Sequence, residues 1–286
     1  MAGIDVHQHL WPPAFVEALR ARTELPRLEG STLHVRGGTY PVDLRDHDLD
    51  TRLALLDRSG IDVAVVSLQT TLGLELVDVE QRSALERAWE DGILELADSA
   101  RGRLVPLSAG RPRSGFQGVA VGADALGDLE ALAPTLDALR VTGLLFVHPV
   151  AADPMPGAPP WWPSVAEYTA QMQRAYLSWL AAGQERWPDV TVVFAILAGG
   201  APIQLERLAS RGVDVRSTLH SNVLFDTASY GRRALELCIE TFGVEQLVFG
   251  TDAPVVDPGH AIGALRGFGD SVERLVRQDT LPRLLA

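Results

Sequence analysis

The stretch GLLFVHP at residues 143–149 decides the fold: four large apolar residues in succession, closed by a histidine. A strand that is apolar on both faces is typical of a parallel sheet covered by helices on both sides. Seven further short runs have the same character: GIDVHQH (3–9), IDVAVVSL (61–68), RLVPLS (103–108), FQGVAVG (116–122), VTVVFAIL (190–197), NVLFDTAS (222–229) and QLVFGTD (246–252). The sequence therefore predicts eight parallel strands.

Longer amphipathic segments fill most of the gaps between these runs. They span residues 48–60, 80–100, 128–139 (interrupted by Pro134), 164–183, 202–212, 231–243 and a C-terminal pair over 260–285. Strand then helix, repeated about eight times, predicts an α/β fold of the (β/α)₈ TIM-barrel type, with a doubly wound open sheet as the alternative. We expect one domain over 1–286, with an insertion around 22–47 and a Pro-rich loop at 151–163.

Composition excludes several classes of function. The chain has 47% hydrophobic residues and a net charge of −12, which argues against nucleic acid or an anionic membrane as partner and leaves a small-molecule substrate. There is no run of eighteen apolar residues and no signal-peptide pattern at the start, so we expect no membrane span and a cytoplasmic protein. Cys238 is the single cysteine, which excludes a disulfide framework and a Cys-rich zinc site.

Four polar residues fall where the chemistry of such a barrel lies, at the carboxyl ends of its strands. His7 and His9 are two apart on the first strand, so their side chains point to the same side. His148 closes the fifth strand and Asp252 the eighth. Three imidazoles and a carboxylate suit Zn²⁺, with Mn²⁺ or Fe²⁺ as alternatives. We expect one divalent metal ion here.

These motifs also carry a family resemblance. IDVHQHLWP (4–12), GLLFVHP (143–149), FAILAGGAP (194–202) and LVFGTDAP (247–254) occur in the order seen in the amidohydrolase superfamily. The chain resembles most closely its branch of amidohydrolase-related proteins that includes aminocarboxymuconate semialdehyde decarboxylase, from residue 3 to the C-terminal DTLPRLL. The resemblance implies a distorted (β/α)₈ barrel and a divalent metal, usually zinc, with His7, His9, His148 and Asp252 as ligands.

The chain departs from the family pattern at one position. A histidine typically follows strand six and acts as a base or polarises the substrate, whereas Ile196 stands here. Isoleucine can neither move a proton nor donate a hydrogen bond, so one catalytic group is missing beside a complete ligand set. His260, eight residues beyond Asp252, is a candidate replacement, with a helix-capping or surface role as the alternative.

Bulky aromatic residues flank the predicted ligands. Trp11 follows the first pair directly, and Trp161 and Trp162 lie in the Pro-rich loop. Such residues either line a pocket for a flat or apolar substrate or pack at a subunit contact. We expect a substrate site formed by Trp11, Trp161, Ile196 and His260, and a homodimer.

Nearby polar residues are interpreted as structural or solvated. Asp5 is expected to be a structural hydrogen bonder, His47 to be solvated within the insertion, and Arg52 to be a solvated charge on a helix.

Three functions remain open. The leading hypothesis is a metal-dependent decarboxylase, a carboxy-lyase acting on a small unsaturated or aromatic carboxylic acid, with Asp252 as the catalytic residue that passes on the proton replacing carbon dioxide. The first alternative is a metal-dependent hydrolase of an ester, lactone or amide, in which Asp252 takes the proton of an activated water. The second is a metal-binding family member whose catalysis is altered or lost through Ile196.

Overall fold

Eight parallel strands form the centre of the molecule. The computed structural model describes residues 3–140, 143–153, 155–215 and 220–279. Every predicted apolar run contains a strand, and the third is broken into two pieces at Leu107. The strands are β1 (Ile4–His9), β5 (Val63–Ser67), β6 (Leu104–Pro106) with β7 (Ser108–Ala109), β8 (Gly118–Gly122), β9 (Leu144–His148), β10 (Thr191–Phe194), β11 (Val223–Asp226) and β12 (Leu247–Val248).

Backbone hydrogen bonds join these strands into a closed ring. The ladders run β1-β5-β6 and β7-β8-β9-β10-β11-β12, with parallel neighbours throughout. At the break in the third strand, the Leu107 N–H donates to Val66 O (2.9 Å) and the Gln117 N–H donates to Pro106 O (3.1 Å). The break therefore leaves the ring connected.

The first and last strands close the barrel. The Val6 N–H donates to Phe249 O (2.8 Å), and the Asp252 N–H donates to His7 O (2.8 Å). The predicted TIM barrel is thus confirmed, and its closure brings the predicted metal ligands of strand one beside that of strand eight.

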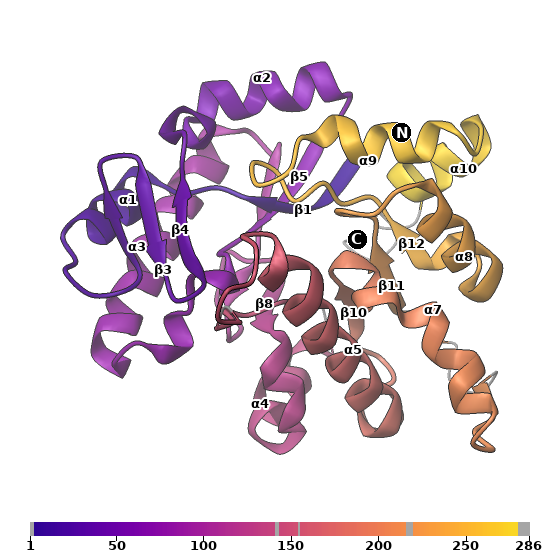
Figure 1. Ribbon diagram of the computed structural model, residues 1–286. Helices are drawn as coiled ribbons and strands as arrows, with labels where there is room; N and C mark the ends of the chain where they lie inside the picture. Colours follow the sequence, from indigo (N-terminus) through magenta and orange to yellow (C-terminus); the bar gives the residue numbers. More distant parts are fainter. Residues whose placement is uncertain (1–2, 141–142, 154, 216–219, 280–286) are drawn as a thin grey trace.

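Helices surround the strands (Figure 1). They are α1 (Pro13–Arg20), α2 (Leu49–Ser59), α3 (Val79–Ser99), α4 (Leu129–Leu139), α5 (Tyr168–Ser178), α6 (Gln184–Arg186), α7 (Ile196–Ala209), α8 (Arg232–Phe242), α9 (Pro258–Arg266) and α10 (Asp270–Arg274). Helix α4 continues through Pro134 instead of breaking there. The C-terminal helix pair predicted over 260–285 corresponds to α9 and α10, and its last six residues, 280–285, lie outside the described residues. Among the described residues, no helix is long and apolar enough to cross a membrane.

An aromatic cluster joins the helices to the sheet. The Tyr176 ring of α5 makes edge contacts with Phe194 of β10, Phe225 of β11 and Phe242 of α8, at centroid distances of 5.6, 5.5 and 6.4 Å. Such contacts add to the burial of apolar surface that stabilises the fold. They fix α5 against the strands that carry the site.

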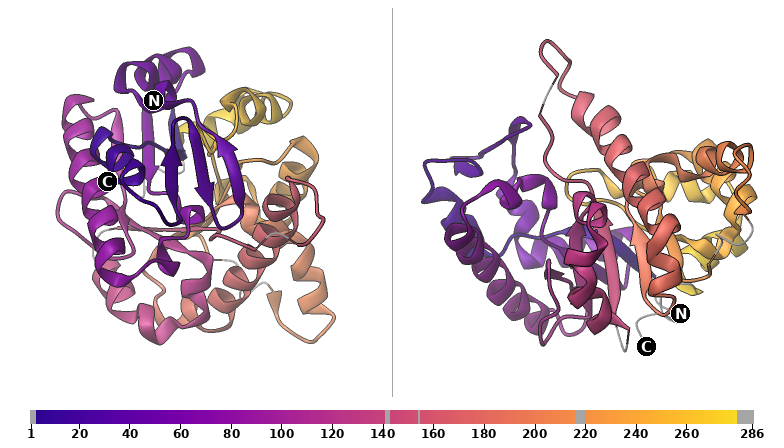
Figure 2. Two further views of the ribbon diagram at one scale, coloured as in Figure 1. Left: turned by 60° about the vertical axis from the view of Figure 1, so that its left-hand side comes forward. Right: turned by 90° about the horizontal axis from the view of Figure 1, so that it is seen from below.

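The insertion around 22–47 contains a small antiparallel sheet, where the sequence indicated only turns. Its strands are β2 (Arg27–Glu29), β3 (Thr32–Val35) and β4 (Gly38–Pro41), paired in the order β2-β3-β4 with Leu33 opposite Tyr40. Figure 2, left, shows this sheet in front of the barrel. Strands of three or four residues are too short for a clear alternating pattern, which is why the sequence did not reveal them.

The Pro-rich loop at 151–163, described except for residue 154, leads from β9 to α5. In Figure 2, right, this connection projects away from the barrel. Trp161 is 55% exposed and stands 5.9 Å, centroid to centroid, from the half-buried Trp162. A π-helical turn (Pro163–Glu167) then runs directly into α5.

Candidate metal centre

The structure brings the four predicted ligands together. His7 and His9 lie on β1, His148 is the last residue of β9, and Asp252 follows β12. One ligand atom from each lies within 4.8 Å of all the others. His7 Nε2 is 3.2 Å from His9 Nε2, and Asp252 Oδ1 is 3.4 Å from the first and 3.3 Å from the second.

The buried Asp226, at the end of β11, orients the His7 ring. Its Oδ2 lies 2.6 Å from His7 Nδ1. A carboxylate oxygen accepts hydrogen bonds, so Nδ1 carries a proton and Nε2 is the nitrogen that faces the cluster. Nε2 would be the ligand atom of a bound metal ion.

The other two histidines are oriented in the same way. His9 Nδ1 donates to Ser67 O (3.0 Å), and His148 Nδ1 donates to Thr70 Oγ1 (2.8 Å), whose own hydroxyl donates to Pro149 O (2.5 Å). Both rings therefore turn Nε2 towards the cluster. A histidine that binds a metal through one ring nitrogen usually donates a hydrogen bond from the other, which fixes the orientation of the ring.

These distances fit a divalent cation. Three imidazole lone pairs and a carboxylate that face one another would repel unless a positive charge lay between them. The three separations among the ligand atoms of His7, His9 and Asp252 are 3.2–3.4 Å, and the ligand atom of His148 lies within 4.8 Å of them, close enough for all four to share one ion. The donor set therefore matches a shared metal ion.

The electrostatics of the cluster favour a cation too. Burial alone lowers the pKa of His7, but the charges of Asp226 and Asp252 outweigh it and raise that pKa to about 9. Burial lowers the pKa of His9 and, more strongly, that of His148. Burial raises the pKa of Asp252, yet His7 and His9 reverse this and keep it below its ordinary value. Asp252 is thus a carboxylate in an environment that attracts positive charge.

A second carboxylate, Asp5, holds Asp252 in place. The hydroxyl of Thr251 donates to Asp5 Oδ2 (2.6 Å) and its N–H donates to Oδ1 (3.1 Å). Asp252 follows with a φ of 63°, a left-handed conformation that Asp adopts more readily than most residues. Gly250 keeps space open here, because a Cβ would stand 3.0 Å from the side chains of both His7 and Asp226 and would press on them.

Ile196 lies at the carboxyl end of β10 and is linked to the metal cluster. Its N–H donates to Asp226 Oδ1 (2.8 Å), the carboxylate whose other oxygen holds His7. From Ile196 to Gly200 the backbone is left-handed, with φ between 47° and 84°. Each non-glycine residue costs roughly 1–2 kcal/mol in this conformation, and such strain concentrates at functional sites. Gly199 cannot be replaced, because its Cβ would lie 2.3 Å from Thr169 O.

Trp11 is buried, and His47 is buried with it rather than solvated as the sequence suggested. The two rings stack with centroids 4.5 Å apart, and the Trp11 N–H donates to His47 Nδ1 (3.1 Å). Trp11 Nε1 also donates to Gln69 Oε1 (2.9 Å). Burial lowers the pKa of His47 to about 3, so its imidazole is neutral.

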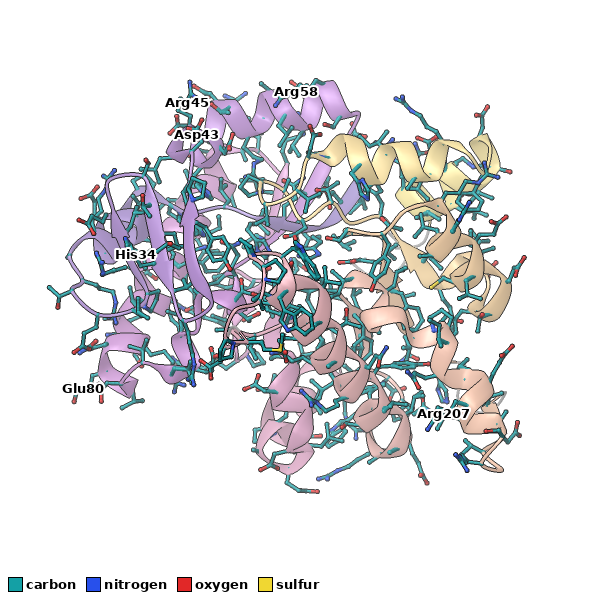
Figure 3. All side chains as sticks on the ribbon, viewed as in Figure 1. His34, Asp43, Arg45, Arg58, Glu80 and Arg207 are labelled. Carbon is teal, nitrogen blue, oxygen red and sulfur yellow. The ribbon has the colours of Figure 1, made fainter. Side chains whose placement is uncertain are left out.

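Arg52 is likewise fully buried, which corrects its interpretation as a solvated charge. Its guanidinium donates to Gln8 Oε1 (2.8 Å), His9 O (2.9 Å) and Asp46 O (3.0 Å). Burial lowers its pKa to about 10. Arg52 therefore holds the strand that carries the ligands, unlike Arg45 and the other charged residues labelled at the periphery in Figure 3.

His260 and Trp161 lie outside the ligand cluster. His260 is exposed in the first turn of α9, and Trp161 is exposed before α5. Sequence reasoning missed Asp226, although VLFD ends its strand with an acid as LVFGTD does. It also missed Thr70, whose role depends on a contact with a residue 78 positions away.

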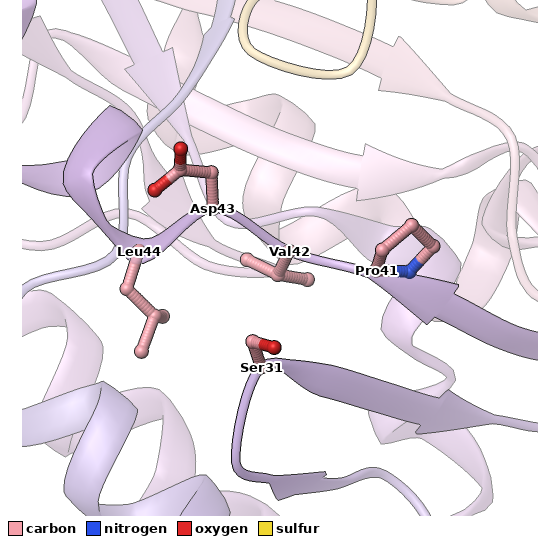
Figure 4. A pocket seen from close by; sticks show the side chains of 5 residues that line it. All are labelled: Ser31, Pro41, Val42, Asp43 and Leu44. Atoms are coloured by element: carbon pink, nitrogen blue, oxygen red, sulfur yellow. The ribbon is translucent and has the colours of Figure 1, made fainter.

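Two hollows lie away from the cluster centre. The lining of a cavity of about 250 Å³ includes Gln69, Thr70 and Val150, and Thr70 also holds the ring of His148. The other hollow lies in the insertion, lined by Ser31, Pro41, Val42, Asp43 and Leu44 (Figure 4). Its single charged group, Asp43, is paired with Arg45, so we assign no chemistry to it.

Comparison with known proteins identifies the family. A family model described as amidohydrolase matches residues 4–273. The chain belongs to the amidohydrolase family. No curated protein matches the chain.

Solved structures similar to this amidohydrolase share its fold at low identity. IDCase from Metarhizium anisopliae in its apo form has 20% identity and a TM-score of 0.81, covering 99% of this chain and 97% of that one. 5-Carboxyvanillate decarboxylase from Novosphingobium aromaticivorans, complexed with manganese and 4-hydroxy-3-methoxy-5-nitrobenzoic acid, has 16% identity and a TM-score of 0.75, covering 99% of this chain and 96% of that one. 2,6-Dihydroxybenzoate decarboxylase from Rhizobium has 15% identity and a TM-score of 0.70, covering 100% of this chain and 98% of that one.

Proposed function

We propose that this protein is a metal-dependent decarboxylase of a small aromatic or unsaturated carboxylic acid. The observation that carries the proposal is an oriented set of three imidazoles and one carboxylate in which the strand-six position is occupied by Ile196. Activation of water by a strand-six base is thereby removed, while binding of a substrate oxygen is not. Decarboxylases among the similar structures support this choice.

Each residue of the site has a role in this scheme. His7, His9, His148 and Asp252 would hold the ion, which would supply a positive charge to bind the substrate's carboxylate. Asp252 Oδ1 faces the histidines, whereas Oδ2 makes no hydrogen bond among the described residues. Asp252 is ionised at rest, so we infer that Oδ2 first takes up a proton from solvent and then passes it on. The bond to the carboxyl carbon breaks, its electrons return to the substrate carbon, and that carbon receives the proton.

We propose zinc as the metal, because three histidines and a carboxylate suit it, and manganese is the competing ion. Elemental analysis should give close to one divalent ion per chain. The double variant His7→Ala/His9→Ala should lose it while keeping its circular dichroism spectrum. Full metal retention in that variant would refute the ligand assignment.

Carbon dioxide release separates the two enzymatic hypotheses. We expect the metal-loaded protein to release carbon dioxide from a member of a panel that includes 5-carboxyvanillate and 2,6-dihydroxybenzoate. A panel of esters, lactones and amides, followed by proton release, tests the hydrolase alternative. Hydrolysis without any decarboxylation would overturn the proposal, and the double histidine variant serves as the inactive control in both assays.

We further propose a homodimer in the cytoplasm. Met155, Trp161 and Val165 are exposed close together in sequence, which gives the projecting loop an apolar surface suited to a second copy. The single cysteine, Cys238, is buried and unpaired, as is usual in a reducing compartment. Sedimentation velocity tests the dimer.

A further inference from the structure

A phenylalanine lies behind the ligand cluster, inside the barrel. Phe146 is two residues before His148 on β9, so both side chains point into the barrel and Phe146 lies farther from the carboxyl end of the strand. Its side chain is fully buried. The centroid of its ring is 5.0 Å from that of the His7 ring, at an interplanar angle of 68°, and 6.0 Å from that of the His148 ring. Phe146 therefore packs against two of the four predicted ligands from the inner side.

The residues beside Phe146 on the neighbouring strands are apolar too. The strand register pairs Phe146 with Ala120 of β8 and Val193 of β10, and Val193 in turn with Leu224 of β11. All four are buried. Phe194, the residue after Val193, packs against α5 on the outside of the barrel, so Val193 faces the interior. This side of the interior is therefore lined by hydrocarbon.

The remaining carboxylate of β1, Asp5, is committed to other partners. Its Oδ1 accepts from the N–H groups of His7 and Thr251, and its Oδ2 accepts from Gln8 Nε2 and the Thr251 hydroxyl. Where a further ligand could approach the cluster from inside the barrel, the protein instead places the ring of Phe146.

Resting on the metal site proposed above, we propose that Phe146 determines which metal ion the site selects, because it closes the inner side of the cluster to any additional ligand. Zinc is satisfied by four or five ligands, whereas manganese favours six, largely oxygen atoms. With four protein ligands in place and Phe146 behind them, exchangeable positions would remain only towards the mouth of the barrel. The site therefore disfavours an ion that needs six ligands.

Phe146→Val tests this role, with Phe194→Val as the matched control. Both phenylalanines are fully buried on neighbouring strands, but Phe194 contacts Tyr176 on the outer face of the sheet. Competition with a chromogenic chelator gives the dissociation constants of zinc and of manganese. Sites with such ligands bind zinc more tightly than manganese in any case, so the readout is the change in that preference. It should fall about 10- to 100-fold in Phe146→Val and stay unchanged in Phe194→Val.

Cobalt loading supplies a second readout that does not depend on turnover. The visible absorption of Co²⁺ is strong with four or five ligands and weak with six. The wild type and Phe194→Val should give the strong spectrum, whereas Phe146→Val should give a weaker one, because its shorter side chain leaves room for a water molecule beside the ion. Circular dichroism establishes that each variant folds, and Phe146→Leu replaces Phe146→Val if the valine variant does not.

Each outcome decides a separate question. If the wild type binds zinc and Phe146→Val keeps the same preference for zinc over manganese, the role assigned to Phe146 is wrong and the metal site stands. Equal changes in Phe146→Val and Phe194→Val also overturn that role, because they indicate a general loosening of the barrel. A wild type that binds neither zinc, manganese nor cobalt overturns the metal site, and with it the proposed function and this inference.

Discussion

Asp226→Asn is the most informative single change in the metal centre. Asp226 Oδ1 accepts from the N–H groups of Ile196 and Ala228, whereas Oδ2 accepts from His7 Nδ1. An asparagine can keep both backbone bonds through its carbonyl oxygen, so its amide N–H₂ then faces His7 Nδ1. His7 Nδ1 must then accept a hydrogen bond from this amide, which requires a lone pair on Nδ1. The imidazole proton therefore moves to Nε2, the nitrogen that faces the cluster.

The magnitude follows from the bond that is exchanged. A hydrogen bond to a charged group contributes about 1.5–3 kcal/mol, and loss of such a partner behind a metal ligand typically weakens metal binding about 10- to 100-fold. We expect a change of this size in the zinc dissociation constant. Asp226→Ala is less useful, because it leaves three buried donors without an acceptor, at about 1–3 kcal/mol each, which is comparable with the whole stability of many proteins.

Competition with a chromogenic chelator measures the dissociation constant of zinc directly. Circular dichroism and thermal melting of the metal-free protein establish that the variant folds. The control is Asp5→Asn, which changes another buried carboxylate near β1 that does not touch an imidazole ring. Asp5 acts on the ligand Asp252 only through Thr251, so Asp5→Asn should lower stability and weaken zinc binding less than Asp226→Asn does. A folded Asp226→Asn protein with unchanged zinc affinity would refute the tautomer argument.

Three further predictions concern residues around the centre. Ile196→His should keep metal content and stability, since His tolerates a positive φ better than a β-branched residue. It should raise the rate of ester or lactone hydrolysis by up to about 10²–10⁴-fold without raising the rate of the native reaction. A native rate that is higher by orders of magnitude would contradict this prediction. Replacing Trp161 and Trp162 by Ala should weaken substrate binding or shift the sedimentation coefficient, and no change in either would show that the loop serves neither purpose. The folded-state pKa of His47 is about 3, below its ordinary value, so the free energy of unfolding should fall as pH drops from about 6.5 towards 3. Urea unfolding should show a smaller fall in the His47→Gln variant. Equal falls in the variant and the wild type would contradict this linkage between protonation and stability.

The alternation of apolar runs and amphipathic segments determined the barrel. Burial on both faces requires continuous apolar strands, and this requirement is local enough to read in stretches such as GLLFVHP. The four ligands were found for a related reason: each lies at or just after a strand end, and in a closed parallel barrel all those ends meet at one rim. Their positions in sequence thus specify a shared location in space.

Tertiary structure decided everything that depends on long-range contacts. Arg52 looks like a solvated helical charge until the end of β1 supplies the Gln8 and His9 oxygens that it binds. Local sequence records propensity and periodicity, whereas a buried polar group is stabilised only by partners that the closed fold brings to it, and that is why the sequence located the ligands and the tertiary structure supplied their supports.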